Sequence, residues 1–158
     1  MEMVVAVAHE EILQPRNISE NYINDTLFIC FMAKINIPRL VGEISRYKRV
    51  VAVYLFGSHA KGKATALSDI DICIIAPAST DAEKSEIGGY ASEKIDIVFF
   101  DELPFTIQWR VLEEGKLLYS RDKRFLADLW SRTFKNYMDF KPIIRKQMRE
   151  FLPGVEYA

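Results

Sequence analysis

The sequence has few residues of the kinds that hold zinc or form disulfides. It contains two cysteines, Cys30 and Cys73, and two histidines, His9 and His59. The cysteines show no metal-ligand spacing, and Cys73 lies inside an apolar run, which predicts a buried thiol in a reducing compartment. The histidines are isolated, and we expect His59 to line a site at most. These observations favour a cytoplasmic protein.

The sequence also lacks a strong charge excess and a long apolar run. It has 21 Lys and Arg residues against 22 Asp and Glu residues, a net charge of −1, so we expect no direct binding to nucleic acid. The apolar runs 3–8 and 27–31 are too short to span a membrane, and the first lacks the basic start and long core of a signal peptide. With 158 residues, 49% hydrophobic and 27% charged, the composition is typical of one globular domain with a real core.

The most informative stretch is residues 57–75, which reads G-S-H-A-K-G-K-A-T-A-L-S-D-I-D-I-C-I-I. Residues 49–56 before it form an apolar, β-branched run of strand length, and residues 72–75 form a second such run. The connection between the two runs is small and polar. It begins at Gly57 and ends in two carboxylates, Asp69 and Asp71.

The spacing of the two carboxylates indicates a metal site. Side chains two residues apart on a strand point to the same face, so Asp69 and Asp71 are expected to lie together, with Cα atoms roughly 6.5–7 Å apart. Two like charges at that distance raise each other's pKa unless a cation lies between them. Mg²⁺ is a hard cation that takes oxygen ligands and keeps positions open for phosphates.

The turn at Gly57 and Ser58 suggests a phosphate site beside that pair. Glycine lets a backbone approach a phosphate closely, and the N–H groups at the start of a following helix attract anions. Each feature alone has an ordinary explanation, because a single D-x-D is usually a solvated strand end and a G-S pair is usually a simple turn. Their occurrence in register, each at the end of an apolar strand, favours nucleotide chemistry.

The same stretch resembles the signature of the DNA polymerase β-like nucleotidyltransferases, in particular their minimal nucleotidyltransferase branch. The branch pattern is G-S-x-A-[RK]-G-x-A-x-x-x-S-D-x-D, and the branch commonly has Arg where this chain has Lys61. The resemblance implies a small mixed β-sheet with flanking helices and, in this chain, a C-terminal helical extension. Every fixed position of the pattern is filled here, by Gly57, Ser58, Ala60, Lys61, Gly62, Ala64, Ser68, Asp69 and Asp71.

The superfamily also uses a third carboxylate on a neighbouring strand. Asp96 lies between Ile95 and Ile97 in the apolar run 94–100, where a charge is costly unless it is paired or bound to metal. Taken alone, Asp96 could equally be a strand-edge carboxylate. The resemblance implies that it is the third metal ligand, the general base, or both.

The resemblance further implies the roles of the site residues. Two Mg²⁺ ions would be bound by the aspartates, and ATP would be the substrate. Lys61 or Lys63 would offset the charge of the leaving pyrophosphate, although either could be a solvated loop charge. The implied catalytic and metal-binding residues are Asp69, Asp71 and Asp96, and the implied nucleotide-binding residues are Gly57, Ser58, Lys61 and Ser68.

Outside the signature, the alternation of helical and strand patterns predicts an α/β domain at residues 32–120. Gly115 is expected to end the helix that precedes it. The expected elements, in order, are a helix at 38–47, strands at 49–56 and 72–75, a loop with at most a short helical turn at 77–90, a strand at 93–100, a helix at 104–114 and an edge strand at 116–119.

Two terminal segments flank this domain. Members of the resembled family usually begin just before the first helix, so residues 1–31 are expected to be a mis-assigned start or a poorly ordered extension. The region 121–158 is expected to be a helical extension that Pro142 breaks in two. From Arg121 to Glu150 it carries nine Lys and Arg against four Asp and Glu. The extension is either a helix packed on its own domain or a surface for a partner, which could be another protein or another copy of this chain.

The resemblance implies transfer of AMP from ATP to a hydroxyl group. Minimal nucleotidyltransferases are often encoded beside small helical HEPN-type toxins, which makes a tyrosine of such a toxin the expected acceptor and this chain an antitoxin. Two alternatives stay open at this point. One is transfer to a small hydroxyl compound such as an aminoglycoside, and the other is an antitoxin that acts by binding alone. The three carboxylates argue against the second, because a purely binding protein has no use for clustered like charges.

Overall fold

A computed structural model of the chain describes residues 36–65 and 67–151, and the side chains of residues 36–65 and 67–146. The expectation for residues 1–31 lies outside the described residues. The elements, in chain order, are α2 (Ile37–Ile44), β1 (Ala52–Phe56), α3 (Gly57–Ala60), β2 (Ile70–Ile75), α4 (Asp81–Gly88), β3 (Ile95–Phe99), a 3₁₀ turn η1 (Phe100–Glu102), α5 (Phe105–Glu114), β4 (Lys116–Ser120) and α6 (Lys123–Phe151).

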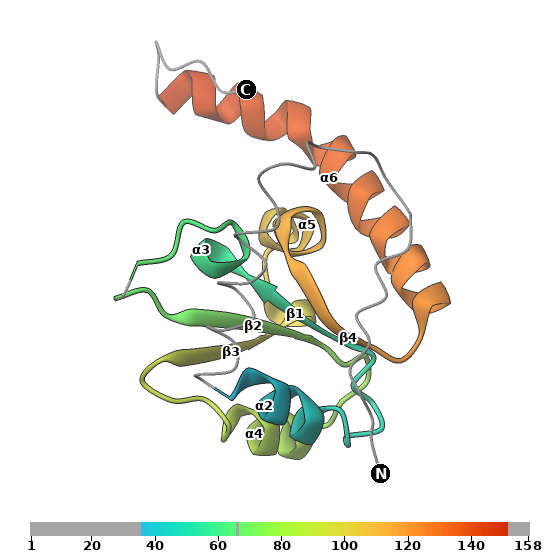
Figure 1. The fold of residues 1–158 in the computed structure, drawn as a ribbon. Helices are drawn as coiled ribbons and strands as arrows, with labels where there is room; N and C mark the ends of the chain where they lie inside the picture. The colour runs from blue at the N-terminus through green and yellow to red at the C-terminus, as the bar shows by residue number, and fades with distance from the viewer. Residues whose placement is uncertain (1–35, 66, 152–158) are drawn as a thin grey trace, which may run out of the picture.

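The four strands form one mixed sheet in the order β3-β2-β1-β4 (Figure 1). Strand β1 pairs antiparallel with β2 and with β4, and β2 pairs parallel with β3. The parallel pair needs a crossover connection, which α4 supplies. The predicted α/β fold with a mixed sheet and flanking helices is therefore confirmed, and β4 lies at an edge as expected.

Helices cover both faces of the sheet (Figure 1). Because strand side chains alternate, Ile72 and Ile74 face α2 and α4 in one core, while Cys73 and Ile75 face α5 and α6 in the other. Full burial of an isoleucine side chain contributes roughly 1.5–3 kcal/mol. The predicted burial of Cys73 is confirmed, and burial raises the pKa of its thiol to about 12.

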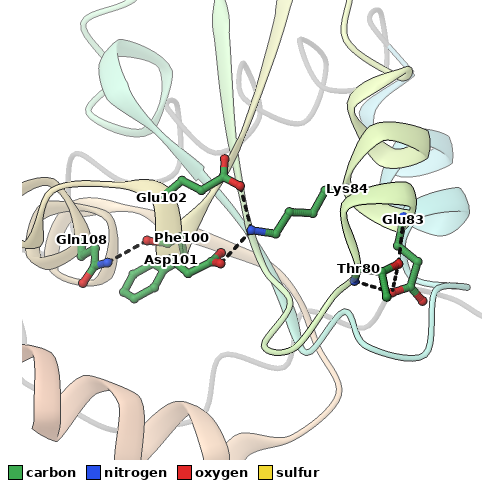
Figure 2. A network of polar contacts seen from close by, with 7 residues as sticks. All are labelled: Thr80, Glu83, Lys84, Phe100, Asp101, Glu102 and Gln108. Carbon is green, nitrogen blue, oxygen red and sulfur yellow. Dashed lines mark hydrogen bonds and ion pairs between the residues drawn. The ribbon is translucent and has the colours of Figure 1, made fainter.

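Helix α4 occupies the segment for which the sequence predicts a loop, so that prediction is wrong in extent. Thr80 caps the helix, since its hydroxyl accepts from the Glu83 N–H while the Glu83 carboxylate accepts from the Thr80 N–H. This capping box satisfies two of the donors that a helix start leaves unpaired. Lys84 then holds the helix to the turn after β3, with its Nζ 2.7 Å from carboxylate oxygens of both Asp101 and Glu102 (Figure 2).

Helix α6 is continuous through Pro142, whereas the sequence predicts a break at that residue. A proline inside a helix removes one backbone hydrogen bond and typically bends the helix rather than ending it when the flanking turns are helical. Figure 1 shows such a change of direction along α6. Among the described residues, no helix is both long enough and apolar enough to cross a membrane.

Candidate active site

The turn after β1 lies directly against the carboxylate of Asp71. Phe56 pairs with Asp71 across β1 and β2, and the next residue, Gly57, has a φ of +70°, a conformation that favours glycine. A Cβ atom on Gly57 would lie 2.0 Å from Asp71 Oδ2. Only a residue without a side chain fits there, so glycine allows the turn and the carboxylate to meet.

The three predicted aspartates share one face of the sheet. Asp71 and Asp96 are partners in the parallel register of β2 and β3, so their backbones lie about 4.8 Å apart. Asp69 lies one residue before β2 and two residues from Asp71, which places it on the same side. This is the face that Cys73 and Val98 share with α5 and α6. The structure therefore places the three predicted aspartates on one face of the sheet.

The electrostatics of Asp71 agree with this placement. Partial burial raises the pKa of the Asp71 carboxyl above its ordinary value, and the nearby carboxylates of Asp96 and Asp69 raise it further. The imidazole of His59 acts in the opposite direction. Asp69 and Asp96 are themselves exposed, and Lys94 Nζ lies 3.9 Å from Asp69 Oδ1. Ionised Asp71 is thus a negative charge in an environment that favours a neutralising cation.

The residues of this face fit a hard divalent cation in type and position. Carboxylate oxygens are the ligands that Mg²⁺ prefers, and Asp71 is half-buried beside two further carboxylates. Within residues 36–65 and 67–146, however, no three His, Cys, Asp or Glu side chains are gathered closely enough to form a ready-made metal cluster. Three like charges repel one another, so a shared face without close convergence is the arrangement expected of the side chains alone.

Two serines of the signature lie in different settings. The hydroxyl of Ser58, in the first turn of α3, has no hydrogen-bond partner among the described residues. The hydroxyl of Ser68 instead accepts from the Thr65 N–H at 2.9 Å and closes the turn that leads into β2. Ser58 is therefore available to a ligand, whereas Ser68 shapes the loop in front of Asp69.

His59 has a larger structural part than the sequence indicated. Its side chain is buried, and its Nε2 lies 3.2 Å from the carbonyl oxygen of Ser68. A carbonyl oxygen only accepts, so the ring nitrogen donates in this contact. The bond joins the end of α3 to the start of β2 across the signature loop. The sequence did not indicate this contact, because His59 occupies a variable position of the signature.

Lys61 is directed toward α5. Its Nζ lies 2.6 Å from Glu114 Oε2 at the last residue of that helix, and Arg110 Nε lies 3.6 Å from the same oxygen. The hydrogen bond from Lys61 lowers the pKa of the Glu114 carboxyl. Sequence reasoning did not identify Glu114, because the contact joins two distant parts of the chain. Lys63 lies on the same loop and is also exposed.

Comparisons with known proteins agree with this geometry. The family described as "Polymerase beta, Nucleotidyltransferase" matches residues 39–124. A protein of Methanocaldococcus jannaschii, provisionally named protein adenylyltransferase MJ1547, is 32% identical over 99 residues, which are 62% of this chain and 78% of that protein.

Solved structures with a similar fold include chains from toxin–antitoxin complexes. One such complex, with AMP-PNP, contains a chain with a TM-score of 0.56 and 21% identity, and the match covers 70% of this chain and 97% of that chain. Another is a complex of a tri-AMPylated Shewanella oneidensis HEPN toxin with an MNT antitoxin, with a TM-score of 0.50, 20% identity, and 72% and 93% of the two chains covered. At these identities the structural matches show a common fold.

Proposed function

This chain belongs to the polymerase beta nucleotidyltransferase family, and we propose that it is an antitoxin that transfers AMP from ATP to a tyrosine hydroxyl of a HEPN-type toxin. The observation that carries the proposal is the contact between the Gly57 turn and Asp71, on a face that Asp69 and Asp96 share. A turn for phosphates beside carboxylates that share one face is the arrangement that nucleotidyl transfer needs.

In the proposed reaction, the acceptor hydroxyl oxygen forms a bond to the α-phosphorus of ATP. The bond from that phosphorus to the oxygen bridging it to the β-phosphate breaks, and pyrophosphate leaves. Asp96, the more exposed carboxylate of the β2–β3 pair, accepts the proton of the hydroxyl. Asp69 and Asp71 would hold Mg²⁺, which when bound supplies positive charge to the attacking and leaving oxygens.

The signature loop holds the triphosphate in this proposal. The backbone at Gly57 and the hydroxyl of Ser58 face the phosphates. Ser68 contributes through the shape of the loop, because its hydroxyl is used by Thr65. Lys61 fixes the loop to α5 through Glu114, which leaves Lys63 as the lysine that meets the charge of the leaving pyrophosphate.

The acceptor is proposed from the relatives. The M. jannaschii protein is provisionally named a protein adenylyltransferase, and a chain of the same fold occurs in a complex with a tri-AMPylated HEPN toxin. Both favour a protein acceptor over a small hydroxyl compound. The size of the described domain agrees, since it is one sheet with its covering helices and has no second domain among residues 36–65 and 67–151.

The test is to incubate the full chain with Mg²⁺, ATP labelled on the α-phosphate, and the HEPN-type protein encoded by the neighbouring gene. We expect label on the HEPN-type protein, dependent on Mg²⁺, and mass spectrometry should place AMP on a tyrosine. A Tyr→Phe change at that position is the control and should remove the label.

Two other results would replace the proposal. Label on an aminoglycoside and none on the protein would indicate a small-molecule acceptor. Growth rescue by an Asp71→Asn variant that is as complete as rescue by the unchanged chain would indicate an antitoxin that acts by contact alone.

A further inference from the structure

Helix α6 is an addition to the family domain that is anchored through its contact with α5. The family match ends at residue 124, and α6 runs from Lys123 to Phe151. The ring of Trp109 on α5 lies 5.3 Å from that of Trp130 and is stacked on Tyr137 at 5.4 Å. The interpretation that the extension packs on its own domain is thus correct for the side of α6 that meets α5.

Helix α6 also carries most of the exposed large hydrophobic residues among the described side chains. Seven large hydrophobic residues are exposed among the described side chains, and two of them, Leu67 and Leu117, lie elsewhere. Single exposed residues need no explanation, but a concentration on one helix marks an interaction site. The other five, with exposed fractions of 36–52%, are Trp130, Phe134, Met138, Phe140 and Ile143.

Three of these residues form a line that continues into basic residues. Side chains that are three or four positions apart are neighbours on a helix surface, and this spacing connects Trp130 to Phe134 and Met138, and then to Lys141 and Arg145. From Lys123 to Lys146 the helix has seven Lys and Arg against two Asp and Glu. We define the α6 face as Trp130, Phe134, Lys135, Met138, Lys141 and Arg145.

The excess of positive charge is concentrated on this helix. Residues 36–122 contain 11 Lys and Arg against 13 Asp and Glu, so the domain beneath α6 is slightly acidic. In a symmetric dimer through the α6 face, each copy would bring its basic excess against that of the other. Like charges at an interface cost binding free energy. The charge pattern therefore disfavours a second copy as the occupant and favours an acidic surface.

We propose that the α6 face is the docking surface for the acceptor protein and binds an acidic, partly apolar surface on it. The proposal rests on the proposed function, since it is the protein acceptor that docks. Met138 and the exposed parts of Trp130 and Phe134, whose rings also pack on Trp109 of α5, would supply the buried centre of the contact. The lysines would increase the association rate. Docking on α6 would hold the acceptor protein beside the domain. The tyrosine hydroxyl of the acceptor would then reach Asp69, Asp71 and Asp96, which lie on the sheet face that α5 and α6 cover.

The test compares two double variants of the full chain with equal changes in charge and polarity. The docking variant is Lys135→Glu with Met138→Ser, which leaves the rings that pack on Trp109 unchanged. The matched control is Lys48→Glu with Leu117→Ser, at an exposed lysine and a 41% exposed leucine that are not part of α6. Binding to the purified HEPN-type protein is measured by interferometry at low and high salt, and folding by thermal melting.

We expect the docking variant to bind at least about tenfold more weakly at low salt, with a smaller salt dependence than the unchanged chain, and the control to bind within about twofold. ATP binding should be equal in all three proteins. Equal binding by the docking variant and the control would overturn the α6 surface. A change from dimer to monomer in the docking variant would also overturn the proposal, because the face would then bind a second copy. Loss of binding to anionic vesicles by the docking variant, with normal binding to the acceptor protein, would overturn it as well.

The two proposals fail in different ways. If the unchanged chain docks through α6 but transfers no AMP, the proposed function is wrong and the docking surface stands. If the docking variant labels the HEPN-type protein at the normal rate at sub-saturating concentration, the docking surface is wrong and the proposed function stands.

Discussion

The two faces of the sheet differ in kind, although the same strands supply both. On β2, Ile72 and Ile74 enter a core with α2 and α4 and have no exposed surface. On the opposite side of the same strand, Asp71 is partly exposed beside Cys73, which is buried under α5 and α6. We call the side covered by α2 and α4 the sealed face. The other side, the open face, is covered by α5 and α6 at one end of the strands and is exposed to solvent at the end that carries the carboxylates.

The difference between the two faces explains how a small domain can keep several like charges that lower its folding stability. The alternation of a strand separates apolar from charged residues by one position, so neither group disturbs the packing of the other. The apolar face supplies folding free energy, and the second face can hold like charges that lower it. A change on the face with the carboxylates should therefore lower activity and leave stability intact, whereas a change on the apolar face should lower stability and leave activity intact.

The largest effect is expected at the open face. Asp71→Asn removes a proposed metal ligand, and loss of several kcal/mol of transition-state stabilisation corresponds to on the order of 10³-fold in rate. Transfer of labelled AMP at saturating ATP measures it. A variant that retains more than about a tenth of the normal rate would contradict the assignment of Asp71.

The same variant should not lose stability. Burial, and then the neighbouring carboxylates, raise the pKa of Asp71 in the folded chain. A carboxyl with a higher pKa when folded binds its proton more tightly in that state, so the free energy of unfolding falls as the pH rises through its pKa. The Asp71→Asn variant avoids that loss because its amide does not ionise. Urea unfolding between about pH 4 and 7 should show an equal or higher free energy at neutral pH and a weaker pH dependence.

The sealed face should show the reverse. Ile72→Ala leaves a cavity where no exposed surface exists, and such changes cost about 2–5 kcal/mol. Urea unfolding should detect a loss in this range. AMP transfer per folded molecule at low temperature should stay near normal, because Ile72 points away from the carboxylates. An equal loss of activity would mean that the two faces are not separable.

Gly57→Ala should affect both properties, since Gly57 lies where the sheet meets the site. The added Cβ would meet Asp71 Oδ2 at 2.0 Å, and φ is +70°. We expect a loss of about 1–3 kcal/mol in unfolding free energy together with loss of AMP transfer. Asp71→Ala in the same chain removes the clash but not the backbone cost of about 1–2 kcal/mol. A double variant no more stable than Gly57→Ala would show that backbone conformation alone is limiting.

Ser58→Ala should have a smaller and purely functional effect. The hydroxyl has no partner among the described residues, so its loss should leave thermal stability unchanged. A net hydrogen bond to a phosphate is worth about 0.5–1.5 kcal/mol, and more when the phosphate is charged and desolvated. KM for ATP should therefore rise by roughly 2- to 13-fold. An unchanged KM and kcat would identify Ser58 as an ordinary turn residue.

The sequence was sufficient for the face that carries the site because the evidence there is local. Strand periodicity located β1 and β2, and a spacing of two residues placed Asp69 and Asp71 together. The position of Asp96 beside Asp71 depends on the parallel pairing of β2 with β3. The resemblance implied only that a third carboxylate lies on a neighbouring strand, and the alternation within one strand cannot predict how strands pair. The site residues themselves stay predictions until they are changed and assayed.

The errors have different physical origins. The Thr80 and Glu83 capping box was present in the sequence, and a search for that pattern would have identified α4. Pro142 was overweighted, because a proline's effect on a helix depends on the flanking turns, which extend through it here. The contacts of His59 with Ser68 and of Lys61 with Glu114 are tertiary, and no spacing rule predicts them.

The smallest effect is expected at the tertiary contact between Lys61 and Glu114, which connects the signature loop to α5. The side chains are 29% and 37% exposed, and solvent screening limits such pairs to about 0.2–1 kcal/mol of stability. The effect on ATP use separates two roles. If Lys61 acts by fixing the loop through Glu114, Glu114→Gln should raise KM for ATP as much as Lys61→Met does, and the double variant should be no worse than either. If Lys61 binds the triphosphate directly, Glu114→Gln releases the ammonium for the ligand, and KM should stay the same or fall while Lys61→Met raises it.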